Sequence, residues 1–118
     1  MGIQNLTEDV VFINLPREPH LGNELETIND IASEGYDCDV IIDFSGVKVL
    51  ASASISNLML LHEFLRAHNR QLVLCNVPVP IQCLFIRFGL ETLFEFAHDQ
   101  SAALEAIREQ RYKKPDEI

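Results

Sequence analysis

Residues 39–58 read DVIIDFSGVKVLASASISNL, an apolar run between two acids that is followed by a turn and a serine-rich segment. An apolar run without alternation is typical of a strand that is covered on both faces. Ser45 and Gly46 break the run, and Val47–Leu50 are expected to form a short extension. The serine-rich segment then opens a helix that ends near Asn69, because apolar residues recur there at helical spacing.

The rest of the chain repeats this alternation of strand and helix. Runs of β-branched and aromatic residues predict strands, and apolar residues three and four apart predict helices. The other predicted strands are Val10–Leu15, Gln71–Asn76 and Leu93–Phe96, with a further one in Ile3–Thr7. The other predicted helices run from an Asn23 cap to near Gly35, from Pro78 to Gly89, and over Ala102–Arg111 with Asp99 as the cap. In the serine-led helix, the apolar face is assigned to Ile55, Leu58, Met59, Leu61, Phe64 and Leu65.

Strands that alternate with helices imply crossover connections and a mainly parallel sheet. We expect an α/β fold in which about four helices surround a sheet of four or five mostly parallel strands. The two central runs lack the alternation of a one-sided sheet, so their side chains should be buried. The core is therefore expected to contain Ile41, Ile42, Leu72, Val73 and Leu74.

Composition and charge exclude several classes of protein. The chain has 118 residues, of which 47% are hydrophobic, and this excludes intrinsic disorder. The formal net charge is −9, and residues 1–63 carry all of it. An acidic chain repels nucleic acid and anionic membranes, so neither is expected as a partner. The acidic half fits either a solvated face or a docking face for a basic partner.

Targeting and redox signals are weak in this chain. The first residues lack a basic region followed by an apolar run, and the longest apolar stretch, Leu58–Leu61, is far shorter than a membrane span. Cys38, Cys75 and Cys83 lack metal-type spacing, and each is expected to be a buried free thiol. We therefore expect a cytoplasmic protein without membrane insertion.

No constellation of residues predicts catalysis. The five glycines stand singly, which excludes a phosphate-binding loop, and the four histidines do not form a metal-type pair. We therefore expect no catalytic residue, no metal and no cofactor. A small enzyme with a serine or cysteine nucleophile stays as an alternative, and it would require a histidine within hydrogen-bond reach of Ser52, Ser54 or Cys75.

The serine-rich segment has a structural and a functional interpretation. Serine is a natural helix cap, because its oxygen accepts a hydrogen bond from the free N–H groups of the first turn. Capping explains one serine but does not need Ser52, Ser54 and Ser56 together. A helix start also favours phosphate, so a hydroxyl here is a candidate to carry a phosphoryl group or to face a partner.

The same segment resembles the STAS domain family, which includes bacterial anti-sigma-factor antagonists and the cytoplasmic domains of sulphate transporters. The family pattern runs roughly DLSxVxFIDSSGLGxL. Two later segments, Gln71–Val77 and Phe88–Phe96, are also similar to the family. The resemblance covers nearly the whole chain and implies the STAS-like (SpoIIAA-like) α/β fold, with residues 1–118 as a single domain and 112–118 as a frayed polar tail. The residues that match the pattern are Asp43, Phe44, Ser45, Val47, Val49, Leu50, Ser52, Ile55 and Leu58.

The chain departs from the family pattern at four neighbouring positions. Ala51 replaces the acid before the serine pair, and Ala53 replaces the second serine, which regulators phosphorylate. Ser54 and Ser56 replace the two glycines that follow. Ala53 has no hydroxyl and cannot accept phosphate, so the family's phospho-switch is in doubt. Ser52 and Ser54 flank the position and are the candidate phosphorylation sites.

The resemblance implies a non-catalytic signalling domain in bacterial transcription regulation. Such a domain docks a protein partner, for example a kinase-like anti-sigma factor, and thereby releases another protein. Exposed residues such as Glu63 and Arg66 would form the rim of the docking surface. Its centre is predicted to contain Lys48, Ser52, Ala53, Ser54, Ser56 and Asn57.

A second reading within the family is a STAS module of a membrane transporter complex, whose partner would be a transporter subunit. Such a module would keep the fold and lack the phosphorylated serine, as this chain does. A neighbouring transporter gene or sigma-factor gene would discriminate between the two readings.

Overall fold

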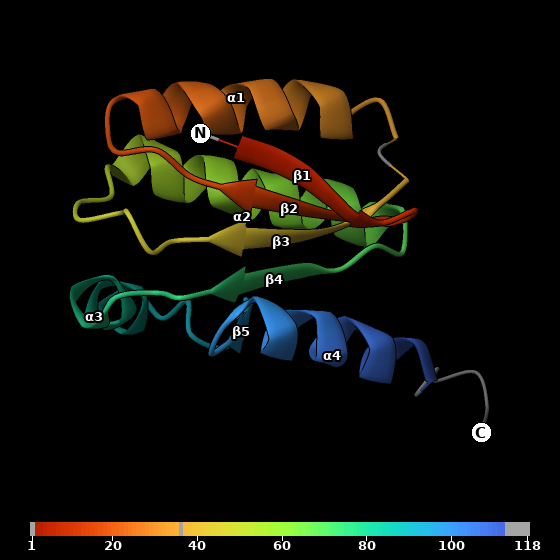
Figure 1. The fold of residues 1–118 in the computed structure, drawn as a ribbon. Coiled ribbons are helices and arrows are strands. Elements are labelled where there is room, and N and C mark those ends of the chain that lie inside the picture. Colours follow the sequence, from red (N-terminus) through yellow and green to blue (C-terminus); the bar gives the residue numbers. More distant parts are fainter. Residues whose placement is uncertain (1, 36, 113–118) are drawn as a thin grey trace.

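The computed structural model describes residues 2–35 and 37–112, which form one five-stranded sheet with four helices (Figure 1). The strands are β1 (Gly2–Thr7), β2 (Val10–Asn14), β3 (Asp39–Asp43), β4 (Leu72–Cys75) and β5 (Glu95–Ala97). The helices are α1 (His20–Ala32), α2 (Ser52–Ala67), α3 (Val79–Arg87) and α4 (Gln100–Tyr112).

The strands lie in the order β1-β2-β3-β4-β5. β1 pairs with β2 in antiparallel orientation, and every later neighbour is parallel. Ile42 of β3 pairs with Ile13 on one side and with Leu74 on the other, so β3 is the centre of the sheet. The expected mostly parallel α/β architecture is confirmed.

Side chains of the central strands alternate between two apolar layers. Ile42 and Leu74 join the larger layer, which α1, α2 and α3 cover, whereas Ile41 and Val73 join a smaller layer under α4. All five predicted core residues are buried, and the most exposed of them, Leu72, has an exposed fraction of 4%. Helices therefore cover β3 and β4 on both faces, as their continuous apolar runs predict.

The first helix begins earlier than its sequence pattern suggests. The prediction of an Asn23 cap is wrong, because α1 starts at His20 with Pro19 as its N-terminal neighbour. Leu21 is fully buried, so the apolar stripe of the helix extends one turn toward the N-terminus. At the other end, Gly35 adopts a φ of 93°, a conformation that few other residues accept without strain.

Elements near the C-terminus are shifted by a few residues. The final strand begins at Glu95 rather than Leu93, because Phe94 is buried against Phe85 in the turn before it. The Asp99 cap is confirmed, since its Oδ1 accepts a 2.9 Å hydrogen bond from the Ala102 N–H. The expected frayed tail was too long at its start, because Tyr112 ends α4. The rest of that tail, residues 113–118, lies outside the described residues.

Two further expectations need correction. Val47–Leu50 do not extend a strand, because Val47 and Leu50 turn into the core and hold the segment as a loop. The cysteines are not uniformly buried: Cys75 is buried, Cys38 is half-buried and Cys83 is exposed on α3. Within the described residues, none of the helices combines the length and the apolar character needed to cross a bilayer.

Candidate partner-binding surface

The loop between β3 and α2 is anchored where it leaves the strand. Asp43 accepts hydrogen bonds from the Ser45 N–H at 2.8 Å and from the Asn14 side-chain amide at 2.9 Å. The Val47 N–H donates to the carbonyl of Phe44, which is completely buried. Between these anchors and the helix, Lys48 and Val49 are exposed. The core residues of the loop thus hold its outer residues at the start of α2.

The serines at the start of α2 lie in different environments. α2 begins at Ser52, which is exposed together with Ala53 and Ser56. Ser54 is only 1% exposed and points toward the β2–α1 connection, where its hydroxyl donates a 2.7 Å hydrogen bond to Oε2 of Glu18. Ser54 is therefore a structural contact of the helix start and is not accessible to a partner.

Glu18 also binds the backbone at the start of α2, which has no side-chain cap. Ala51 occupies the N-cap position and has no side chain that could accept a hydrogen bond, but its backbone N–H donates to Glu18 Oε2 at 2.8 Å. The same region is tightly packed, because a Cβ added to Gly22 of α1 would lie 3.3 Å from the Ser54 hydroxyl. A carboxylate from the β2–α1 connection thus places negative charge at the positive end of α2.

Asn57 has a mainly internal contact. Its side chain is half-buried, and its backbone carbonyl accepts a 3.0 Å hydrogen bond from the amide of Asn29 on α1. This bond connects α1 and α2, two of the three helices that cover the larger apolar layer. Of the predicted docking residues, Lys48, Ser52, Ala53 and Ser56 are exposed, Asn57 is at the margin and Ser54 is inside.

The sequence pattern missed the apolar part of this surface. It assigned Met59 to the core, but Met59 and its neighbour Leu60 are exposed to 39% and 44%. Val49, in the loop, is exposed to 68%. Met59 and Leu60 lie three and four residues after Ser56, and residues so spaced share one face of a helix. That spacing from the serines is the signal that would have found them.

Two of the three candidate nucleophiles, Cys75 and Ser54, lack the activation that a nucleophilic enzyme needs. Burial, with smaller contributions from the charges of Asp43 and Asp99, raises the pKa of the Cys75 thiol to about 12. A thiol with this pKa does not form a nucleophilic thiolate at neutral pH. The Ser54 hydroxyl donates its hydrogen bond to the Glu18 carboxylate rather than to a histidine. Within residues 2–35 and 37–112, no three His, Cys, Asp or Glu side chains are grouped so that they could hold a metal ion.

A family model for the STAS domain matches residues 20–103, from the first residue of α1 into α4. The chain belongs to the STAS domain family. The match includes β3, the loop after it and the start of α2. No curated protein matches the sequence.

Solved structures confirm the STAS fold. An anti-sigma-factor antagonist (STAS) domain protein from Planctomyces limnophilus is 18% identical in sequence. Its TM-score is 0.78, and the match covers 91% of this chain and 97% of that protein's chain. The unphosphorylated form of SpoIIAA, a Bacillus anti-sigma factor antagonist, is 19% identical, with a TM-score of 0.68 and coverages of 93% and 96%. The STAS domain of a SulP transporter from Vibrio cholerae is 12% identical, with a TM-score of 0.75 and coverages of 92% and 89%. At these identities, the likeness concerns the fold.

Proposed function

We propose that this STAS domain is a non-catalytic regulatory module that docks a protein partner through the start of α2. The observation that carries the proposal is one exposed face on which small side chains adjoin apolar ones. We define this α2 surface by Lys48, Val49, Ser52, Ala53, Ser56, Met59 and Leu60. The surface lies beside the carboxyl end of β3, where the loop enters the helix (Figure 1).

The chemistry of the α2 surface suits a protein partner. Small residues at positions 52, 53 and 56 allow another backbone to approach closely. Val49, Met59 and Leu60 supply apolar area that would leave water on binding. Methionine in particular adapts its shape to a partner, as it does at other binding surfaces. Glu63 and Arg66 are exposed further along the helix and give the surface a charged rim.

Regulation of this surface would differ from a switch at residue 53. Ala53 is exposed at the first turn of α2 but has no hydroxyl, whereas Ser52 is exposed beside it. Ser52 is therefore the accessible candidate for phosphorylation. A phosphoryl group there would add up to two negative charges to a surface that must be desolvated on docking. Without modification, the surface would stay permanently competent to bind.

The partner that we propose is a kinase-like anti-sigma factor, and the protein would then act as an anti-sigma-factor antagonist in transcription regulation. A transporter subunit is the second candidate. Two observations favour it: the lack of a hydroxyl at residue 53, and the similarity in fold to a SulP transporter STAS domain. Both candidates use the same surface, so one experiment can address them together.

The test is affinity capture from the native cell with a tagged chain, followed by mass spectrometry and phosphosite mapping. The bait carries either the natural sequence, Leu60→Glu on the α2 surface, or Ile31→Glu as a matched control. Ile31 is an apolar residue that is 51% exposed near the end of α1. We expect the same specific partner with the natural and Ile31→Glu baits, and its loss with Leu60→Glu.

The identity of the captured protein decides between the two candidates. An anti-sigma factor supports the antagonist function, and a transporter subunit supports the alternative. Equal capture by all three baits would overturn the assignment of the docking surface.

A further inference from the structure

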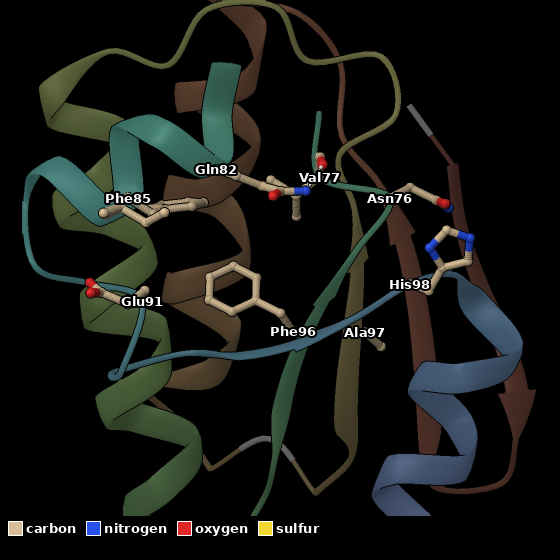
Figure 2. Close-up of a pocket in the computed structure, with 9 residues that line it drawn as sticks. Asn76, Val77, Gln82, Phe85, Glu91, Phe96, Ala97 and His98 are labelled. Carbon is tan, nitrogen blue, oxygen red and sulfur yellow. Dashed lines mark hydrogen bonds between the residues drawn. The ribbon is translucent and has the colours of Figure 1, made fainter. Parts of the chain in front are cut away.

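A cavity of about 530 Å³ lies at the carboxyl ends of β4 and β5, outside the α2 surface (Figure 2). Its volume is within the range of small-molecule sites. After β4 the chain turns to α3, which packs on the larger apolar layer, and after β5 it turns to α4 on the opposite face. The connections therefore diverge at this point. In open α/β sheets, such a crevice outside the carboxyl ends of the strands is where ligands usually bind.

Aromatic side chains build the floor of the cavity. The ring of Phe96, on β5, is half-buried, and its centroid is 5.7 Å from that of the fully buried Phe85 on α3. Figure 2 shows the Phe96 ring among the labelled residues, between Glu91 and the pair Asn76 and His98. Because Phe85 supports it from within the core, the Phe96 ring offers a flat apolar surface in a fixed position.

Polar groups stand at two ends of this surface. Asn76 adopts a φ of 53°, a rare conformation for a residue other than glycine, and its backbone N–H donates to the carbonyl of His98 at 3.3 Å. That bond holds the end of β4 beside the start of α4. Glu91 lies at the other end, before β5, and its side chain is exposed.

The charge of the cavity favours one class of ligand. Among the described residues that line the cavity, Glu91 is the only one with a carboxylate side chain. None of these lining residues is a Lys or an Arg. Among its described lining residues, the cavity therefore presents a carboxylate acceptor for cations and, apart from the imidazole of His98, no basic side chain for phosphate or carboxylate ligands.

We propose that this cavity binds a small planar aromatic ligand with a cationic nitrogen group, of the amidine or amine class. The ring of the ligand lies on Phe96, and its nitrogen group donates to the Glu91 carboxylate. Asn76 contacts the end of the ligand opposite the nitrogen group. This inference does not depend on the proposed docking function, because no residue of the α2 surface lines the cavity.

The test uses three probes of nearly equal shape: benzamidine (cationic), benzamide (neutral) and benzoate (anionic). Each is titrated into the natural chain, and binding is followed through backbone amide NMR shifts. We expect saturable benzamidine shifts at Asn76, Ala97 and His98. A fragment of this size should show a Kd on the order of 1 mM. Benzoate should bind at least about tenfold more weakly than benzamidine, because its carboxylate and the Glu91 carboxylate repel each other.

Variants separate the two contacts. Glu91→Gln should weaken benzamidine binding about five- to tenfold and leave benzamide within about twofold, since only the charge-assisted bond is lost. Glu95→Gln is the matched control, because Glu95 is exposed on β5 but does not line this cavity, and it should change neither probe. Phe96→Leu should weaken all aromatic probes, provided that its spectrum shows an intact fold.

Three results would overturn the proposal. The first is benzamidine shifts that map elsewhere or fail to saturate. The second is benzoate binding as tight as benzamidine binding. The third is benzamidine affinity unchanged in Glu91→Gln, which does not touch the core and keeps the test valid even if Phe96→Leu unfolds.

Discussion

The hydroxyl of Ser54 and the carboxylate of Glu18, 36 residues apart in sequence, form a 2.7 Å hydrogen bond that is shielded at the start of α2. The same carboxylate oxygen accepts from the Ala51 N–H. One side chain from the β2–α1 connection therefore fixes the beginning of another helix. Because Ser54 is buried, the bond forms away from competing water and should contribute to stability.

Removal of the Ser54 hydroxyl should destabilise the protein. Ser54→Ala leaves Glu18 with one donor fewer in a partly desolvated place, and the free energy of unfolding should fall by about 1–3 kcal/mol. Ser56→Ala is the matched control, because Ser56 is exposed, and it should stay within about 0.5 kcal/mol of the natural protein. Urea denaturation measures both. Equal effects would mean that the bond with Glu18 adds nothing.

A carboxylate at residue 53 should be compatible with folding but not with partner docking. Ala53→Asp places a negative charge in the exposed first turn of α2, where the helix dipole favours it by about 0.3–1 kcal/mol. Thermal melting should therefore show a folded protein of equal or higher stability, and Ala53→Ser should be neutral.

Partner capture gives the second readout for these variants. It should be weakened by Ala53→Asp, because the charge must be desolvated on docking, and preserved by Ala53→Ser. Normal capture by a folded Ala53→Asp protein would remove residue 53 from the interface.

Asp39 should be one of the most sensitive charged positions. It is 2% exposed at the start of β3, and it accepts hydrogen bonds from Arg111 at 2.6 Å and from the Gln71 N–H at 2.8 Å. Asp39→Ala removes the acceptor of both bonds and leaves the Gln71 N–H without its partner, whereas Arg111 keeps its ion pair with Asp9, so the change should cost about 1–3 kcal/mol. Asp37 pairs with Arg70 on the surface, so Asp37→Ala should change stability by about 0.5 kcal/mol or less. Chemical denaturation of both variants checks the contrast.

Stability should decline in alkali because of Cys75. Its pKa is about 12 in the folded protein, against 9.0 for an ordinary thiol, so the unfolded chain releases this proton first as the pH rises. The effect of Cys75 on the free energy of unfolding is therefore constant below about pH 9, and stability is lost between pH 9 and pH 12. From pH 8 to pH 10 the loss should be about 1 kcal/mol. Cys75→Ala should show a correspondingly shallower decline, measured by denaturation at several pH values. Parallel declines in both proteins would contradict the linkage.

The elements that were predicted well are those whose signals are local. The apolar run of β3 and the Asp99 cap depend on residues that are adjacent in sequence. The errors arose where tertiary contacts decide: Leu21 extends α1 only because the sheet is there to cover it, and Phe94 leaves the predicted strand to pack on Phe85.

The candidate site divides in the same way. Periodicity placed the start of α2 and the exposed Ala53, but it could not show that Ser54 turns inward to a carboxylate 36 residues away. Met59 was misassigned because an apolar residue next to an apolar stripe gives no local sign of exposure. The cavity beside Phe96 left no motif, since its residues come from three separate segments.

The close approach of Gly22 to Ser54 makes residues 18, 22 and 54 a single unit of variation. A Cβ at position 22 would press on the hydroxyl at 3.3 Å, whereas a glycine at position 54 would leave space for it. Homologous sequences with glycine at 54 should therefore accept a larger residue at 22. A graft of this helix start onto another STAS domain must transfer all three positions, because a partial transfer either crowds the Ser54 hydroxyl with a Cβ at residue 22 or removes one of the two donors to the Glu18 carboxylate.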